Sequence, residues 1–416
     1  MTVDVKRGSQ RLALTAGVAV RARLVVVTTH PIQYQCPVWR GLAAVPELAT
    51  HVLFGSDCSV RGHFDHGFGQ RLKWTVPLLD GYSHEFLGHG PVNRLMVGPI
   101  CGRQSLFSRL RTLNPTACLI NGYSPPLYSH VVAACRSLGI PILLRAETTD
   151  ADRDRSGVHR GVRDALLRVL YSRVSRFLAI GKNSRAHFLR LGVPPARISD
   201  ALYCVDTDLF ESQYQRRHEG VFRRELGIPE AAMLVLFSGK LIPKKDPQTL
   251  LAAVGQMAAI GGRPVHLVFL GDGPLRATLS DEAQRMAPGR VHFVGFRQQE
   301  AIGEVYTDAD MLVLPSIFSE TWGLVVNEAM QFGLPCIVSD RVGCAPDLVV
   351  SGVTGQVFAH GDVGSLTSCL RKTGAMVMED PRGVHARCRQ KVAAYSTAAA
   401  VKAITAAAAE ESGLQP

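Results

Sequence analysis

The chain has 416 residues, of which 46% are hydrophobic and 19% are charged, and this length predicts two domains of about 200 residues each. No uninterrupted apolar run reaches the roughly 18 residues of a membrane span, so we expect a protein that is soluble or lies on a surface. Residues 1–205 hold 26 Lys/Arg against 12 Asp/Glu, whereas the remainder holds 20 against 23. A basic first half without a zinc finger or RNA-binding motif favours phosphate-bearing small molecules or anionic membrane over nucleic acid.

The N-terminus places basic residues ahead of a short apolar stretch. This weakly imitates a signal peptide, but Thr15 and Gly17 break the stretch, so residues 1–22 are expected to form a flexible extension. The ten cysteines are scattered, with no C-x-x-C pair and no Cys/His cluster at zinc spacing. They predict a reducing cytoplasm, with neither disulfides nor a structural metal.

Short apolar strands alternate with helical stretches through the first half. Strands are predicted at 23–31, 50–55, 116–122, 141–147 and 175–181, and helices at 131–139 and 158–176. This alternation predicts parallel βαβ units and a Rossmann-like domain over residues 23–205. Helix 158–176 has arginines on one face and leucines on the other. Packing against the sheet is the favoured interpretation, and contact with anionic lipid is the alternative.

The second half repeats this alternation after a polar, arginine-rich linker at 206–230. Strands are predicted at 233–240, 265–274, 291–296, 311–316 and 335–340, and helices at 249–261, 275–287 and 323–333. They predict a second Rossmann-like domain over residues 231–395, with ligands bound beyond the carboxyl ends of the strands. Residues 396–416 form an Ala-rich helix with few large side chains. We expect it to dock across another element, with the first domain as the candidate.

Three lysines follow the first strand of the second half. The stretch SGKLIPKKDPQTL contains Lys240, Lys244 and Lys245. A helix is expected to begin near Asp246 or Pro247, because Asp is a good N-cap and Pro a good first residue. Three ammonium groups ahead of a helix N-terminus suit a polyanion such as a diphosphate. The alternative is a solvated basic loop.

Two further strand tips carry candidate binding residues. GDGP follows the next strand, where Gly271 and Gly273 let the backbone approach a ligand closely, although an ordinary turn has the same composition. Gly295, Phe296 and Arg297 end the strand after that, at an edge that could receive a nucleobase.

The stretch SETWGLVVNEAM, residues 319–330, contains two glutamates eight positions apart. Glu320 is predicted in a loop and Glu328 within a helix that ends at Gly333. The free amides from Thr321 to Leu324 would favour an anion at the start of this helix. For the segment alone, the favoured interpretation is that Glu320 is a capping acid and Glu328 a surface residue.

Together, in this order, these motifs resemble the donor-binding domain of family 4 retaining glycosyltransferases, the group 1 glycosyl transferases of the GT-B fold. The resemblance runs from about residue 233 to residue 360. It implies two Rossmann-like domains that face each other across a cleft. It also implies an enzyme that moves a sugar from a nucleoside diphosphate sugar, with UDP more common than GDP, to a hydroxyl acceptor in glycan, glycolipid or natural-product biosynthesis.

The resemblance assigns a role to each motif residue. Lys240 and Lys245 would hold the diphosphate and act catalytically with Glu320, which would face the transferred sugar. Glu328 would accept hydrogen bonds from the ribose. The remaining donor-binding candidates are Gly239, Gly271, Gly273, Phe296, Arg297, Thr321, Trp322, Gly323 and Leu324, with Phe296 and Arg297 beside the base.

No metal or other cofactor is expected, because two lysines and a helix N-terminus can stabilise the departing diphosphate. Asp308 and Asp310, like Asp150 and Asp152, have the D-x-D spacing of a metal site. Asp308 and Asp310 lie between a helix and a strand, so metal binding is disfavoured. We expect a cytoplasmic monomer or weak dimer that contacts a nucleotide sugar, an acceptor and an anionic membrane surface. The alternatives are a non-catalytic nucleotide-sugar-binding subunit and a GT-B phosphorylase or epimerase.

The first half departs from the family pattern. Its first loop, THPIQYQCPVW, lacks the usual Gly-Gly, and LLRAETTD lacks the usual histidine. Candidate acceptor or sugar contacts at these tips are His30, Gln33, Tyr34, Arg145 and Glu147, although Arg145 and Glu147 are equally explained as a structural ion pair. In VRGHFDHGFG, His63, Asp65 and His66 fit either a metal trio or, preferably, a mobile loop near the acceptor.

Overall fold

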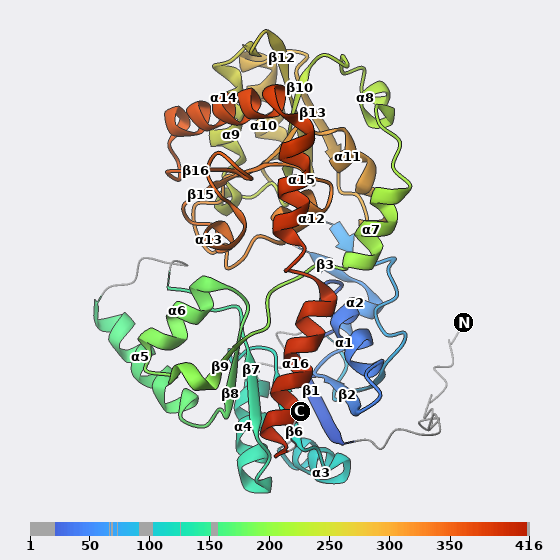
Figure 1. Ribbon diagram of the computed structural model, residues 1–416, viewed down its shortest axis with the longest axis vertical. Coiled ribbons are helices and arrows are strands. Elements are labelled where there is room, and N and C mark those ends of the chain that lie inside the picture. The colour runs from blue at the N-terminus through green and yellow to red at the C-terminus, as the bar shows by residue number, and fades with distance from the viewer. Residues whose placement is uncertain are drawn as a thin grey trace.

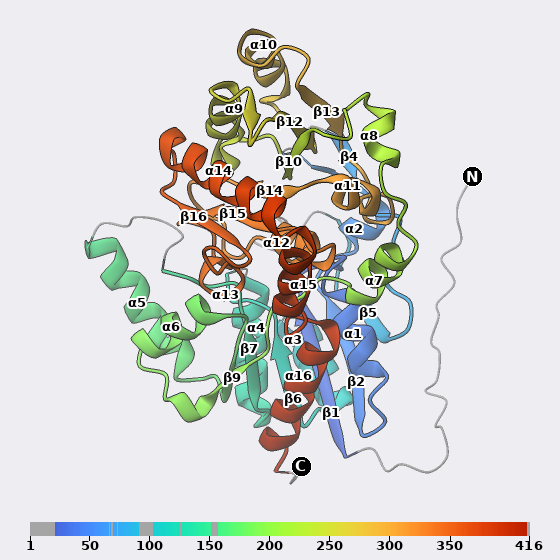
Figure 2. The same ribbon diagram turned by 45° about the horizontal axis from the view of Figure 1, so that its top comes forward.

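The computed structural model describes residues 21–65, 67, 70–72, 74–90, 103–124, 126–150 and 157–413. They form two α/β domains stacked end to end, and the C-terminal helices run along both of them (Figures 1 and 2). Each domain is built on a mainly parallel sheet with helices on its faces. The predicted fold class, two Rossmann-like domains in a GT-B arrangement, is confirmed.

The first sheet has the strand order β5-β2-β1-β6-β7-β8-β9, with every neighbouring pair parallel. Its strands are β1 (Ala22–Thr28), β2 (Leu48–Phe54), β5 (Ser83–Phe86), β6 (Ala117–Ile120), β7 (Ile142–Arg145), β8 (Arg176–Ala179) and β9 (Ile198–Asp200). Strand β1 lies inside the sheet between β2 and β6, where Val26 pairs with Val52 and Leu119. Central strands buried on both faces explain the continuous apolar runs of the sequence.

Helices cover both faces of this sheet. They are α1 (Cys36–Ala43), α2 (Cys58–Arg61), α3 (Arg103–Leu113), α4 (Pro126–Leu138), α5 (Gly157–Tyr171) and α6 (Lys182–Arg190), with a 3₁₀ turn at Pro195–Arg197. A separate antiparallel pair, β3 (His63–Asp65) and β4 (Gln70–Leu72), projects from the loop that follows α2. Helix α5 is shorter than predicted, because the chain turns at residues 172–174 before β8 begins.

The second sheet has the order β11-β12-β10-β14-β15-β16, and β13 pairs with β12. Its strands are β10 (Met233–Ser238), β11 (Ala259–Ile260), β12 (Arg263–Leu270), β13 (Val291–Gly295), β14 (Met311–Leu314), β15 (Cys336–Ser339) and β16 (Gly355–Phe358). Its helices are α9 (Pro247–Gly255), α10 (Arg276–Met286), α11 (Gly303–Asp308), α12 (Leu324–Gln331), α13 (Ala345–Leu348) and α14 (Val363–Glu379), with 3₁₀ turns at Pro243–Lys245 and Gln299–Ala301.

The predicted helix 249–261 is too long. Helix α9 ends at Gly255, and residues 259–260 instead pair antiparallel with the start of β12. Gly261 and Gly262 both have positive φ, at 55° and 82°, and make the tight turn of this hairpin. Two consecutive glycines with these angles explain why the apolar helical pattern stops early.

The segment 206–230, predicted as a linker, contains two short helices. These are α7 (Thr207–Gln215) and α8 (Val221–Glu225). Phe210 and Phe222 are fully buried in a core cluster that they share with the second domain. Helix α7 packs on α11 and α12, so this segment is structurally part of the second domain.

The C-terminal helices join the two domains. Helix α15 (Pro381–Val392) packs on α12, and α16 (Thr397–Glu411) packs on α1 of the first domain (Figure 1). Ala400, Ile404 and Ala407 bury the inner face of α16 in the first domain's core. By length and composition alone, Pro381–Glu411, which comprises both helices, could cross a membrane, with a mean hydropathy of 1.3 over a window that is 33% buried. Lys391 and Lys402 interrupt this segment, so the predicted absence of an uninterrupted apolar run of about 18 residues is unaffected.

Gly271 is required where three strand tips of the second sheet meet. Its φ is 136°, its N–H donates to the Gly295 carbonyl at 2.8 Å, and an added Cβ would lie 1.9 Å from the Gly239 carbonyl oxygen. We expect Gly271→Ala to lower the free energy of unfolding by about 3 kcal/mol, from backbone strain and overpacking together. Urea unfolding measures this.

Gly289→Ala is the matched control. Gly289 has a φ of 71° and open space around its Cβ position, so this change should cost only the left-handed strain of about 1–2 kcal/mol. Equal losses for the two variants would contradict the close approach at Gly271.

Candidate active site

The carboxyl ends of both sheets face a cavity of about 370 Å³ between the domains. Parallel sheets place their loops at this edge, so residues distant in sequence meet here. Gln33 and Asp65 line the cavity from the first domain, and Lys240, Phe296 and Glu328 line it from the second. His30 and Tyr34 are also part of the wall.

Lys245 and Glu320 form an ion pair at the start of α12. The Lys245 Nζ bonds to Glu320 Oε2, and Ser316 Oγ donates to the same oxygen at 2.9 Å. Both side chains are little exposed, at 13% and 12%. Burial raises the pKa of the Glu320 carboxyl, but the Lys245 ammonium outweighs it and the net pKa is lowered. The pair therefore places opposite charges in a region from which most water is excluded.

The two loops that carry this pair are interlocked. Ile317 N–H donates to the Lys244 carbonyl at 3.0 Å, and the Lys244 ammonium donates to the Ser319 carbonyl at 3.2 Å. Asp246 and Ser319 have positive φ, 47° and 57°, a conformation that non-glycine residues adopt rarely and that is enriched at functional sites. Lys244 thus bonds within the loops and does not face the cavity beside Lys240.

The N-terminus of α12 points into the cleft with free amides. Gly323, at φ 102°, caps the helix. Within the described part of the chain the N–H groups of Trp322, Gly323 and Leu324 have no protein acceptor. The Trp322 ring turns inward instead, where Nε1 donates to Asn327 Oδ1 at 2.8 Å. The backbone of Trp322, and not its ring, is therefore presented to a ligand.

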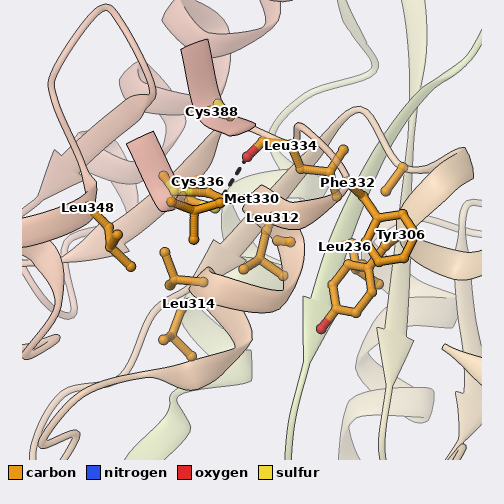
Figure 3. Close-up of a cluster of buried hydrophobic side chains, with 14 of the residues drawn as sticks. Leu236, Tyr306, Leu312, Leu314, Met330, Phe332, Leu334, Cys336, Leu348 and Cys388 are labelled. Atoms are coloured by element: carbon orange, nitrogen blue, oxygen red, sulfur yellow. Dashed lines mark hydrogen bonds between the residues drawn. The ribbon is translucent and has the colours of Figure 1, made fainter. Parts of the chain in front are cut away.

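Glu328 lies one turn after the start of α12, against the core. Tyr306 donates its hydroxyl to Glu328 Oε2 at 2.7 Å, and its ring stacks on Phe332 with centroids 5.6 Å apart. Figure 3 shows these two rings together at the edge of the apolar cluster that contains Leu236 and Leu312. Burial raises the pKa of Glu328 to about 7, although Tyr306 and Lys245 oppose the rise.

Lys240 faces the first domain. Its Nζ lies 2.8 Å from both carboxylate oxygens of Asp65, which closes the cleft with an ion pair between domains. The interpretation of His63, Asp65 and His66 as a metal trio has no support from Asp65, which bonds to Lys240. His66, and the side chain of His63, lie outside the described residues.

The end of β13, where the base was expected to bind, contacts an aromatic side chain of the first domain. The Phe296 ring meets Trp74 of the first domain edge to face, with centroids 6.2 Å apart. Arg297 lies over Phe222 and donates to Glu225 at 3.2 Å, so α8 holds its guanidinium. Phe296 is thus an apolar face beside the cavity, while Arg297 already has a carboxylate partner.

Glu147 reaches across the cleft, and Arg145 does not pair with it. Tyr34 and Tyr203 donate their hydroxyls to Glu147 Oε1, and Thr321 donates to Oε2 at 3.0 Å. Arg145 is buried and donates to the backbone carbonyls of residues 201 and 202. The alternative of a structural Arg145–Glu147 pair is therefore wrong, because the two side chains bond to different partners.

A second cavity, of about 400 Å³, lies on the first domain's side of Glu147. Asn121, Tyr123 and Arg163 line it together with Thr321 of the second domain. His30 and Gln33 face the first cavity rather than this one, and His30 Nδ1 lies 2.9 Å from Thr29 Oγ1. The first-domain candidates are therefore divided between two neighbouring cavities.

Residues 219–375 match the family model described as Glycosyl transferases group 1. The second domain is a group 1 glycosyltransferase domain. D-inositol 3-phosphate glycosyltransferase of Corynebacterium efficiens is 35% identical over 174 residues, 40% of this chain and 40% of that protein. Sulfoquinovosyl transferase SQD2 of Arabidopsis thaliana is 32% identical over 171 residues, 40% of this chain and 31% of that protein. The chain thus matches less than half the length of these relatives.

The whole chain shares its fold with solved structures. HepE of Anabaena, solved in complex with UDP and glucose, has a TM-score of 0.67 over 94% of this chain and 100% of that one, at 16% identity. At this identity the likeness concerns the fold alone. It extends over both domains, whereas the family match covers the glycosyltransferase domain. The suspected relationship to group 1 glycosyltransferases is confirmed for residues 219–375, and the GT-B fold is confirmed for both domains.

The D-x-D pairs have structural partners in and beside the glycosyltransferase domain. Asp308 accepts the N–H groups of Gly220 and Arg223 at 2.6 and 3.0 Å, and Asp310 bonds to the Arg223 guanidinium at 2.7 Å. Asp150 bonds to Arg190, and Asp152 lies outside the described residues. Within the described ranges no group of three His, Cys, Asp or Glu side chains is placed to hold a metal ion.

Sequence motifs missed several residues that position the site of the glycosyltransferase domain. Tyr306 and Ser316 hold the two glutamates, and Tyr203 bonds to Glu147. The sequence predicts Asp65 only as a metal ligand or as part of a loop near the acceptor, and not as the partner of Lys240. Ser316 stands inside the predicted strand tip MLVLPS, where its position at a carboxyl end was the one available indication. Tyr203 and Tyr306 lie outside the motifs, and only the packed fold brings them here.

Proposed function

We propose that this chain is a retaining glycosyltransferase that moves a sugar from a nucleoside diphosphate sugar, with UDP favoured, to a hydroxyl of a glycan, glycolipid or natural-product precursor. The observation that carries the proposal is the buried Lys245–Glu320 pair beside the free amides at the start of α12. A cation and a helix N-terminus at one point make a site for a charged leaving group.

The positions of the polar groups support this donor. Lys245, Lys240 and the α12 amides hold the diphosphate, and Gly239 and Gly271 let it approach the strand tips. Glu328, at the cavity wall, accepts the ribose hydroxyls. The base lies against Phe296, in the corner shared with Trp74. A volume of about 370 Å³ is at the small end of the range for ligand sites, which suits a nucleotide in a closed cleft.

In the reaction, the bond between the anomeric carbon and the diphosphate oxygen breaks. The acceptor oxygen bonds to that carbon on the same face, and its proton passes to a phosphate oxygen. Glu320 orients the sugar, while Lys245 and the amides stabilise the negative charge on the departing diphosphate, so the residues themselves meet the electrostatic need. The proposal includes no metal ion or other cofactor.

Closure of the cleft protects this reaction from water. Asp65 bonds to Lys240, and Glu147 bonds to Thr321, so both ends of the site are bridged between the domains. A closed site limits the competing attack of water on the donor. When the donor binds, the diphosphate replaces Asp65 as the partner of Lys240, and the Glu147–Thr321 bond is the bridge that remains during the reaction.

The name of one group of relatives supports an anionic acceptor. By their names, the relatives act on inositol 3-phosphate or transfer sulfoquinovose, and HepE was solved with UDP and glucose. Arg163 in the second cavity and the basic first half fit an acceptor with negative charge. We place this activity in the cytoplasm, where nucleotide sugars are available, with a monomer or weak dimer as the working form.

Mass spectrometry of the purified chain with UDP- and GDP-sugars tests the proposal. Slow release of free sugar and nucleoside diphosphate supports the transferase, and NMR of a glycosylated product reports retention at the anomeric carbon. Tight donor binding without turnover would instead identify a non-catalytic subunit. Turnover that requires inorganic phosphate would identify a phosphorylase, and a donor epimer among the products an epimerase.

A further inference from the structure

Helix α5 turns an apolar stripe toward solvent. Val158, Val162, Leu166 and Val169 are 77%, 59%, 67% and 54% exposed. Spacings of four, four and three residues place them on one face of the helix. Both views show α5 at the outer edge of the first domain, beside α6 (Figures 1 and 2). A stripe of four large apolar side chains on one exposed face is unusual for a helix that is merely part of a soluble surface.

The stripe does not hold α5 in place. The opposite face does so, through the buried side chains of Leu167 and Tyr171. Asp164 is also buried there and accepts two hydrogen bonds from Arg190, one of 3.1 Å to Oδ1. The favoured interpretation of this helix, packing on its own domain, therefore accounts for its inner face and leaves the outer one unexplained.

Among the described residues, the exposed charges of α5 and of the turn that follows it are of one sign. Arg160, Arg168 and Arg173 are exposed on or directly after the helix, whereas Asp164 is the one acidic residue of α5 and is buried against Arg190. We propose that this face of α5 docks on an anionic lipid bilayer. The apolar side chains enter the acyl boundary, and the arginines remain at the level of the phosphates.

A bilayer fits this face better than a second copy of the chain does. Two copies that paired through α5 would bring like charges together along the whole helix, which costs free energy. A bilayer provides hydrocarbon for the stripe and phosphates for its basic flanks, and long arginine side chains can span the two levels. The excess of 26 Lys/Arg over 12 Asp/Glu in residues 1–205 adds longer-range attraction to the same surface.

Docking would also bring the site close to the membrane. Arg163, on the inner side of the same helix, donates to the Tyr123 hydroxyl at 3.3 Å and lines the 400 Å³ cavity. A lipid headgroup that leaves the bilayer for this cavity would have to pass only α5. This consequence rests on the proposed function, whereas the docking itself does not.

Vesicle sedimentation of the full chain tests the docking without donor or acceptor. We expect binding to vesicles of 70% phosphatidylcholine and 30% phosphatidylglycerol, and at least tenfold weaker binding to pure phosphatidylcholine. The variant Val162→Ser/Leu166→Ser should bind the anionic vesicles at least tenfold more weakly, and Arg160→Glu/Arg168→Glu should lose binding similarly. Because all four residues are exposed, their variants should keep the melting temperature of the parent.

Met286→Ser/Val357→Ser is the matched control, since both residues are exposed apolar side chains of the second domain, at 39% and 38%. Its binding should equal that of the parent. The proposal would be overturned if the parent did not bind anionic vesicles, or if the α5 variants bound as well as it does. It would also be overturned if the parent formed a dimer in sedimentation velocity that Val162→Ser/Leu166→Ser dissociates. None of these results depends on whether the chain turns over a nucleotide sugar.

Discussion

Replacement of Lys245 by methionine is expected to lower the rate of donor turnover by about 10²–10³-fold. The Lys245 ammonium is 13% exposed and bonds to Glu320. In the proposed reaction it also faces the charge that develops on the diphosphate. Removal of one preorganised donor from such a site costs about that factor. Steady-state release of nucleoside diphosphate measures it, with Lys372→Met, an exposed lysine of α14, as the control that should retain the parent rate.

Loss of stability must be separated from loss of chemistry. Lys245→Met leaves the Glu320 carboxylate buried without its cation, a change that costs about 3–5 kcal/mol of folding free energy. The double variant Lys245→Met/Glu320→Gln removes both charges and should regain most of that stability while remaining inactive. If the double variant recovered turnover together with stability, Lys245 would be a structural residue and its catalytic assignment would be wrong.

Replacement of Glu328 by glutamine is expected to stabilise the empty protein and to weaken nucleotide binding. Burial raises the pKa of this carboxyl from 4.5 to about 7 in the folded chain. The folded state therefore holds the proton more tightly than the unfolded state, and stability from this group falls as the pH rises from about 4.5 to about 7. At pH 8 the variant should exceed the parent by as much as about 3 kcal/mol, at about 1.4 kcal/mol per pKa unit.

The same change should weaken UDP binding by about 10–100-fold at pH 8, because a charged acceptor of ribose hydroxyls is worth about 1.5–3 kcal/mol. The parent should also bind UDP more weakly below pH 7, as Glu328 takes up its proton. Calorimetric titration measures affinity and urea unfolding measures stability, with Glu304→Gln, an exposed position on α11, as the control. A gain in stability at pH 4.5 as large as that at pH 8 would refute the pKa argument.

Apolar patterning predicted the centre of both sheets and missed their edges. Runs such as VVVTT and MLVLFS form β1 and β10, which are buried on both faces. The overlooked strands β5, β9 and β16 are short edge strands with polar or small residues, such as SHEF and GQVF. An edge strand is specified by its hydrogen-bonding neighbour more than by its own composition, so its sequence carries little periodicity.

The candidate site was likewise predicted only in part. Motif order indicated Glu320, Glu328 and Lys245, and the structure brings them to one end of α12. Spacing did not indicate which way each lysine turns. Lys244 bonds back to the Ser319 carbonyl, whereas Lys240 crosses to Asp65. A flexible lysine side chain bonds to the nearest carboxylate or carbonyl, and only the assembled fold determines which group that is.

The chain passes between the domains twice, and the two crossings are bonded to each other. After β9 the backbone enters α7, and after α15 it returns into α16. Thr397 Oγ1 donates to the Val205 carbonyl at 3.1 Å, and Thr207 Oγ1 donates to Thr397 Oγ1 at 3.2 Å. Because these bonds link the two crossings, we expect relative rotation of the domains to pivot near Val205 and Thr397. Such a rotation would separate Asp65 from Lys240 and leave the junction itself unchanged.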